Sequence, residues 1–270
     1  DGRYQLAYNG EIYNYIELRS ELRQRGWHFS TQTDTEVLLK AYEAWGSDCL
    51  KLFNGMFAFV IYDTRAQTLF MARDRVGIKP LYYHDAGDAL YFASEIKALR
   101  AAELLPPTVN EQALFDYLVF NRTDIYDETF LNGVKRIPKG CCAVYDQAGL
   151  QIRRWWSPDD FRHTPVHTHL KDINAHLDEL MVSAVDLRMR SDVPVGSCLS
   201  GGLDSSAALG IASRESGNGQ HAFTICFEDQ DYDESSVAKE TARFCGAELH
   251  PVKLSERQLV DHIHAAARAS

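Results

Sequence analysis

The residues CLSGGLDSS at positions 198–206 combine two glycines, three serines and one aspartate directly after an apolar run. Between a strand and a helix, such small residues let backbone N–H groups converge on phosphate oxygens at the helix N-terminus. No lysine follows the glycines, so the segment is not the G-x-x-x-x-G-K-[ST] motif. Asp204 supplies a carboxylate of the kind that holds Mg²⁺ beside phosphates. The segment predicts a phosphate-binding loop; the alternative is a turn that only needs positive φ at Gly201 or Gly202.

A second group of polar residues lies near the beginning of the sequence. Residues 8–15 read YNGEIYNY, and residues 33–46 read TDTEVLLKAYEAWG. Taken alone, Asn9 and Gly10 are typical of a tight turn that ends a short strand over residues 4–8. Likewise, Asp34 or Thr35 is a typical N-cap for the helix that follows. The residues by themselves therefore leave a structural role and a chemical role open.

The elements that position these residues are predicted from hydrophobic periodicity. Two helices, each ended by a glycine, are expected over residues 15–24 and 34–45. The remaining elements of this half alternate strand-like runs with one helix, which predicts a layered α+β domain over residues 1–156. They are strands over 56–63, 68–74, 80–85 and 89–94, a helix over 111–120, and strands over 141–146 and 150–155.

After that domain the pattern changes. Residues 157–170 are polar, contain proline and are rich in histidine, which is typical of an interdomain linker. We expect its histidines (His163, His167 and His169) to be solvated rather than to bind a metal. Residues 171–270 show a βαβαβ pattern typical of a parallel sheet. Its elements are a helix over 171–189, a strand before the glycine loop, a helix over 203–214, a strand over 221–227, a helix near 235–245 and a strand over 247–254.

Composition excludes several classes of protein. The 270 residues are 45% hydrophobic and 24% charged, as in ordinary globular proteins. A net charge of −10 argues against a nucleic-acid groove, which needs a basic surface. No apolar run approaches the length of a transmembrane helix, so no membrane partner is expected. The six cysteines show no C-x-x-C spacing, which favours reduced thiols and a cytoplasmic location.

The motifs together resemble known families. The glycine loop resembles the S-G-G-x-D-S pyrophosphate loop of the ATP pyrophosphatase superfamily, where a lysine is not expected because pyrophosphate is the leaving group. The N-terminal half resembles the class II glutamine amidotransferase domain through YNGEIYNY, TDTEVLLKAYEAWG, GMFAFVIYD, ARDRVGIKPLYY and FASEIKAL. In this order, the two halves resemble the glutamine-hydrolysing asparagine synthetases. The resemblance implies an αββα sandwich of the N-terminal-nucleophile type, followed by an α/β parallel-sheet ATP pyrophosphatase domain, both incomplete.

The resemblance also implies roles for individual residues. The Asn9 side chain and the Gly10 N–H match an oxyanion hole, while Glu11 and Asp34 match the acids that hold the α-amino group of glutamine. Leu199 and Ile225 match positions whose backbone approaches the adenosine of ATP. The residues that match the pyrophosphate loop are Ser200, Gly201, Gly202, Asp204, Ser205 and Ser206, with Asp204 as the Mg²⁺ ligand.

Three further residues near the ATP-site candidates are given lesser roles. Cys226 stands where the family commonly has glycine, and we expect its side chain to point into the core. Asp233 and Glu234 are weaker site candidates, because an acidic helix start is explained by the helix dipole.

The family's nucleophile is a cysteine at the mature N-terminus, where its own amine acts as the general base. All six cysteines here are internal, so we expect a fragment truncated at both ends, with neither glutaminase nor ligase turnover. For the parent protein the resemblance implies glutamine, aspartate and ATP with Mg²⁺ as small-molecule partners, and a possible homodimer. Aspartate would be activated as a β-aspartyl adenylate, which ammonia converts to asparagine.

Two alternatives stay open at this point. The parent could be a relative that amidates or cyclises another carboxylate, as β-lactam synthetase-like cyclases do. It could also be a non-catalytic nucleotide-binding remnant. Such cyclases dispense with the terminal cysteine, so the upstream sequence discriminates them, and the retained Asn9, Gly10, Glu11 and Asp34 favour a working glutaminase. A remnant would have little need for both sites.

Overall fold

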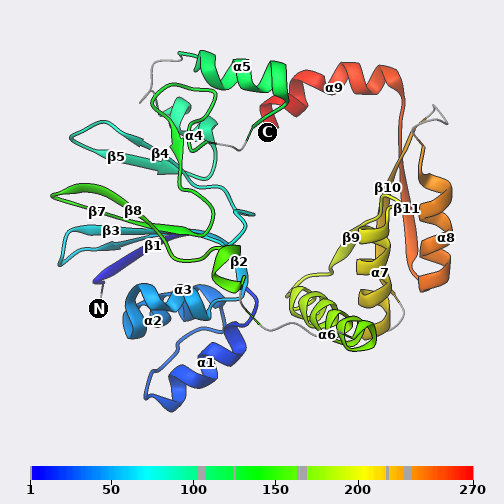
Figure 1. The fold of residues 1–270 in the computed structure, drawn as a ribbon, viewed down its shortest axis with the longest axis horizontal. Coiled ribbons are helices and arrows are strands. Elements are labelled where there is room, and N and C mark those ends of the chain that lie inside the picture. Colours follow the sequence, from blue (N-terminus) through cyan, green and yellow to red (C-terminus); the bar gives the residue numbers. More distant parts are fainter. Residues whose placement is uncertain are drawn as a thin grey trace. The chain divides into compact units, whose positions relative to one another are not determined.

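A computed structural model describes residues 2–102, 108–123, 126–162, 164, 169–216, 219–227 and 233–269 of the chain. The chain divides into two compact units, Asp1–Thr164 and Pro165–Ser270 (Figure 1). His163 and His167 of the predicted linker lie outside the described residues, whereas a short 3₁₀ helix occupies Pro158–Phe161 within it.

The first unit contains two β-sheets. The larger sheet is antiparallel, with the order β1-β2-β3-β7-β8. Its strands are β1 (Tyr4–Ile12), β2 (Gly55–Asp63), β3 (Thr68–Arg73), β7 (Cys141–Asp146) and β8 (Gly149–Arg154). The smaller sheet has the order β5-β4-β6, with β4 (Tyr82–Asp85), β5 (Leu90–Ala93) and β6 (Lys135–Arg136).

Helices lie outside both sheets and complete a layered sandwich (Figure 1). The helices α1 (Tyr15–Gln24), α2 (Asp34–Trp45) and α3 (Cys49–Leu52) cover the larger sheet, while α4 (Ile96–Ala101) and α5 (Glu111–Phe120) lie beyond the smaller one. Side chains of β2 alternate between two hydrophobic cores. Phe57 and Phe59 pack against the helices, whereas Val60 packs between the two sheets. The expected αββα arrangement is confirmed.

The second unit is built on a parallel three-stranded sheet with the order β11-β10-β9. Its strands are β9 (Gly196–Cys198), β10 (His221–Phe227) and β11 (Glu248–Leu254). Its helices are α6 (Leu170–Arg188), α7 (Leu203–Ser216), α8 (Ser235–Cys245) and α9 (Glu256–Ala269). A small core of Leu199, Leu209, Ala222, Ala238 and Ala242 joins the sheet to α7 and α8. The predicted βαβαβ pattern is confirmed.

Two local predictions are wrong. The turn expected at Asn9 and Gly10 does not form, because β1 continues to Ile12 and pairs these two residues with Ala58 and Phe57 of β2. The cap of α2 is Thr33, whose side chain accepts a hydrogen bond from the Glu36 backbone N–H, rather than Asp34 or Thr35. The cap at Thr33 leaves the Asp34 carboxylate available for other partners.

The structure agrees with the prediction of unpaired thiols, and the core position expected for Cys226 stays a prediction. The six cysteines all lie among the described residues, and all are free thiols. Cys141 and Cys142 are buried in β7, and Cys226 is partly buried. Burial raises the pKa of the Cys49 thiol, so this side chain is no nucleophile. Within the described part of the chain, no helix is both long and apolar enough to cross a bilayer.

Candidate functional site

Close approach of two strands explains the glycine at position 10. Gly10 has φ of +153°, and a Cβ built on it would lie 2.2 Å from the Met56 carbonyl oxygen and 2.7 Å from the Phe57 Cα. No side chain fits there without moving the β2 backbone. Gly10 is therefore required by strand packing rather than by a turn.

The Asn9 carboxamide bridges the two sheets of the first unit. Its Nδ2 donates to Oγ of Ser94, which directly follows β5, over 3.1 Å. Both residues line a small cavity of about 190 Å³, together with Tyr8, Leu81 and other residues of β1, β2 and the β5 end. An amide donor therefore lies at the wall of a cavity large enough for a small polar group.

Asp34 is held next to the same strand by two donors. Its Oδ2 accepts hydrogen bonds from the Tyr8 hydroxyl (2.7 Å) and from the backbone N–H of Ile12 (3.0 Å). Burial and the neighbouring Asp34 charge raise the pKa of the Tyr8 phenol, so this hydroxyl remains a donor throughout the neutral range. Asp34 is also the first residue of α2, where the helix dipole favours a negative charge. Glu11 precedes Ile12 on β1 and is exposed.

Sequence reasoning gave no role to the supporting residues Tyr8, Ser94 and Asp74. Asp74 is buried, and its carboxylate accepts backbone hydrogen bonds from Phe57 and from four consecutive residues, 76–79. It therefore ties the loop after β3 to the part of β2 that pairs with Gly10. All three residues lie within the quoted motifs YNGEIYNY, FASEIKAL and ARDRVGIKPLYY. Their polar side chains inside those motifs were the signal that could have identified them as supporting residues.

The glycine loop of the second unit leaves the carboxyl end of β9 and enters α7. Leu199 is buried and extends the β9 pairing, since its N–H donates to the Phe223 carbonyl over 2.8 Å. Gly201 has φ of +79°, and a Cβ there would approach Glu234 O and Val237 Cβ to 3.3 and 3.2 Å. Positive φ at Gly201 is thus confirmed, and the loop passes close to the start of α8.

Serine hydroxyls brace the loop from inside. The Ser205 Oγ accepts from the Ser200 N–H (3.3 Å) and donates to the Gly202 carbonyl (3.1 Å). The hydroxyl oxygens of Ser200 and Ser205 lie 3.1 Å apart. The Ser206 N–H donates to the same carbonyl over 3.1 Å. Asp204 projects from the first turn of α7 and is exposed. An exposed carboxylate beside a helix N-terminus fits a hydrated Mg²⁺ carried by a nucleotide.

The remaining ATP-site candidates lie on neighbouring segments. Ile225 is in β10 and half exposed on the open face of the sheet. Asp233 accepts hydrogen bonds from the backbone N–H groups of Phe227 and Ser235 and from the Ser235 hydroxyl, and these bonds lower its carboxyl pKa. Glu234 is the N-cap residue of α8 and makes no side-chain capping bond.

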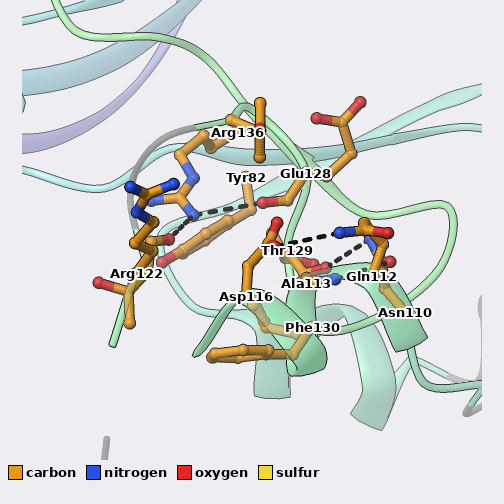
Figure 2. A pocket seen from close by; sticks show the side chains of 13 residues that line it. Tyr82, Asn110, Gln112, Ala113, Asp116, Arg122, Glu128, Thr129, Phe130 and Arg136 are labelled. Carbon is orange, nitrogen blue, oxygen red and sulfur yellow. Dashed lines mark hydrogen bonds between the residues drawn. The ribbon is translucent and has the colours of Figure 1, made fainter. Parts of the chain in front are cut away.

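The first unit also contains a larger cavity of about 460 Å³ (Figure 2). Two polar side chains of its wall have backbone partners: Arg136 donates to the carbonyls of Thr123 and Glu128, and Asn110 donates to the Thr129 carbonyl. None of the residues to which the resemblance assigns a role lines this cavity, so we assign it no part in the reaction.

Comparison with known proteins identifies both units. Residues 1–156 match the family model described as the glutamine amidotransferase domain, and residues 176–270 match asparagine synthase. Asparagine synthetase [glutamine-hydrolyzing] 3 of Bacillus subtilis is 36% identical over 278 residues, covering 97% of this chain and 45% of its own. Asparagine synthetase [glutamine-hydrolyzing] 1 of the same organism is 39% identical, with coverage of 92% and 38%.

A fungal protein is also similar. Amidase chyE of Penicillium rubens is 30% identical over 98% of this chain and 41% of its own. The chain thus spans less than half the length of these three relatives. Among solved structures, the glutamine phosphoribosylpyrophosphate amidotransferase of B. subtilis aligns with 93% of this chain and 61% of its own, with a TM-score of 0.44 and 18% identity. Strand order and the family matches define the fold.

Proposed function

The chain belongs to the family in which a glutamine amidotransferase domain precedes an asparagine synthase domain, and from this premise we propose that the whole protein makes asparagine. Glutamine supplies the ammonia, and aspartate accepts it. The reaction converts ATP to AMP and pyrophosphate. The single observation that carries the glutamine half is that β1 holds Asn9 and Gly10 and also binds the Asp34 carboxylate of α2, through the Tyr8 hydroxyl and the Ile12 N–H.

In the first unit, the proposed roles follow from the donors and charges around the cavity. The Asn9 amide and the Gly10 N–H stabilise the oxyanion that forms on the glutamine carboxamide, a contribution of a few kcal/mol per donor. Asp34 and Glu11 bind the α-ammonium group of glutamine. Support for Asp34 comes from its fixed orientation, because the Tyr8 hydroxyl and the Ile12 N–H both donate to Oδ2, while the Thr35 hydroxyl donates to Oδ1 over 3.4 Å.

In the second unit, the loop from Ser200 to Ser206 holds the phosphates of ATP, and Asp204 holds Mg²⁺. The ion neutralises phosphate charge when bound. Three features of the loop support this role: the positive φ of Gly201, the hydrogen-bonded hydroxyls of Ser200 and Ser205, and the N-terminus of α7, which directly follows the glycines. The backbone of Leu199 and Ile225 lines the adenosine side. The family resemblance is the basis for proposing that the protein is a homodimer. The free thiols support a cytoplasmic location, because cysteines stay reduced in that compartment.

The test separates the two half-reactions in the whole protein. Pyrophosphate release is measured with ATP and Mg²⁺, with glutamine or ammonium as the nitrogen source, and with or without aspartate. Asn9→Ala should abolish glutamine-dependent release and leave ammonium-dependent release intact, whereas Asp204→Asn should abolish both. Release that does not depend on aspartate would contradict asparagine as the product, and no release at all would leave the loop as a nucleotide-binding remnant.

A second candidate function is amide formation on a carboxylate other than that of aspartate. The observation that keeps it open is that the chain is also 30% identical, over nearly its whole length, to a fungal protein named as an amidase and not as an asparagine synthetase. It predicts aspartate-independent pyrophosphate release that a different acid stimulates, which the same assay detects with a panel of carboxylates.

A further inference from the structure

Two histidines and a glutamate meet at the amino-terminal end of the parallel sheet. His221 is the first residue of β10, Glu248 is the first residue of β11, and His250 follows two residues later. The parallel register pairs His221 with Glu248 and Phe223 with His250. Residues at i and i+2 of a strand share a face, so all three side chains project from the same side of the sheet.

The donor atoms of these side chains converge on one point. The ring nitrogens Nδ1 of His221 and Nε2 of His250 face each other at 2.9 Å. Glu248 lies beside both, with Oε2 at 3.6 Å from the His221 nitrogen and Oε1 at 3.8 Å from the His250 nitrogen. One ligand atom from each residue lies within 4.8 Å of the other two.

The surrounding sheet fixes this arrangement and leaves it open to solvent. The Phe223 ring stacks on the His250 imidazole, with ring centroids 4.9 Å apart, which restrains the rotation of His250. The two histidine side chains are 43% and 36% exposed and that of Glu248 is 66% exposed, so an ion can reach the cluster.

We propose that His221, His250 and Glu248 bind a divalent first-row transition-metal ion, with Zn²⁺ as the probe ion. Two imidazole nitrogens and one carboxylate oxygen form a donor set that Zn²⁺ takes with a fourth position left for water. Zn–N bonds of about 2.0–2.1 Å at a tetrahedral angle place two ligand nitrogens about 3.3 Å apart. The distance of 2.9 Å between the His221 and His250 nitrogens therefore has to increase by only a few tenths of an ångström for both to bind one ion.

This site is distinct from the proposed Mg²⁺ position. Asp204 follows the carboxyl end of the sheet, whereas His221 and Glu248 begin their strands at the opposite edge. The glycine loop leaves β9, which pairs with one side of β10, whereas Glu248 and His250 lie on β11, at the other side of β10. The donor sets also differ, since Mg²⁺ prefers oxygen alone and the new site offers two nitrogens. The ion would thus join β10 to β11 and take no part in ATP chemistry.

The experiment titrates the 270-residue chain, freed of metal by chelation, with Zn²⁺ by calorimetry and with Co²⁺ by visible absorption. We expect one tight equivalent, a tetrahedral Co²⁺ spectrum, and a Zn²⁺-dependent rise in the melting temperature. His221→Gln, His250→Gln and Glu248→Gln should each weaken this equivalent by about tenfold or more and remove the thermal shift.

Control variants separate this cluster from other histidines. His262→Gln, on the exposed surface of α9, and a combined change of the linker histidines His163, His167 and His169 to glutamine should leave the equivalent and its spectrum unchanged. Far-UV circular dichroism establishes that each variant is folded. If the wild-type chain binds no Zn²⁺, or if folded His250→Gln and Glu248→Gln both bind it as the wild type does, the cluster is a hydrogen-bonded pair and the proposal is overturned.

Discussion

At the scale of single residues, the backbone around Gly10 matters as much as the side chains near it. We expect Gly10→Ala to lower the free energy of unfolding of the first unit by about 2–3 kcal/mol, because its Cβ would overlap the β2 backbone at Met56. Urea unfolding followed by tryptophan fluorescence measures the change.

Gly26→Ala is the matched control for Gly10→Ala. Gly26 also has positive φ (+89°), but a Cβ there meets no atom within 4 Å. Gly26→Ala should therefore lower the free energy of unfolding by about 1 kcal/mol, through backbone strain alone. Equal losses in the two variants would show that close strand approach is not the reason for glycine at position 10.

The proposed role of Asn9 predicts an effect of Ser94 on glutamine-dependent synthesis. Ser94→Ala removes the Oγ that accepts from Asn9 Nδ2, so the carboxamide loses one restraint. In the whole protein we expect glutamine-dependent kcat to fall roughly fivefold, the equivalent of about 1 kcal/mol, with ammonium-dependent synthesis unchanged. Ser20→Ala, on the exposed side of α1, should change neither rate. A parallel loss with ammonium would indicate a purely structural role.

At the scale of elements, one ion pair fastens the beginning of β1 to the end of β2. Arg3 donates from Nη2 and Nε to the Asp63 carboxylate at 2.7–3.2 Å, and this carboxylate also accepts from the N–H groups of Arg65 and Ala66 in the β2–β3 turn. The hydrogen bonds from Arg3, followed by those from the turn, lower the pKa of Asp63 to about 2.

This lowered pKa predicts a pH dependence. A carboxyl whose pKa is lower in the folded than in the unfolded chain stabilises the fold above the unfolded value of about 4. The stabilisation should be lost as the pH falls from about 4 to about 2. Unfolding midpoints in urea between pH 5 and 2.5 should fall less steeply for Asp63→Asn than for the wild type. Asp88→Asn, at an exposed position, should retain the wild-type slope.

At the scale of the whole molecule, the two units have separate cores and should respond separately to core mutations. All four tryptophans (Trp27, Trp45, Trp155 and Trp156) belong to the first unit, so their fluorescence reports that unit alone. Leu209 is fully buried in the second unit. Leu209→Ala should destabilise that unit by about 2–5 kcal/mol.

The readout for Leu209→Ala is a divergence between two probes. Unfolding followed by far-UV circular dichroism, which senses helices of both units, should shift to lower urea, while the tryptophan transition stays in place. Leu38→Ala, which removes a fully buried side chain of the first unit, should shift the tryptophan transition. A common shift of both probes in Leu209→Ala would show that the chain unfolds as one cooperative unit.

The sequence by itself determined the elements and their order. The helices 15–24, 34–45 and 111–120 and the parallel sheet of the second unit lie where periodicity and glycine ends predicted them. These features are readable because they depend on spacing within one short segment. Positive φ at Gly201 was predictable for the same reason, since strand, glycine pair and helix are contiguous.

Only the tertiary structure decided which residues meet. Asn9 and Gly10 have a local preference for a turn, but pairing with β2, nearly fifty residues later, overrides it. The contacts of Asp34 with Tyr8, of Asn9 with Ser94 and of His221 with His250 likewise join distant segments. Local spacing carries no information about such contacts, because the register between strands is set by packing of the whole sheet.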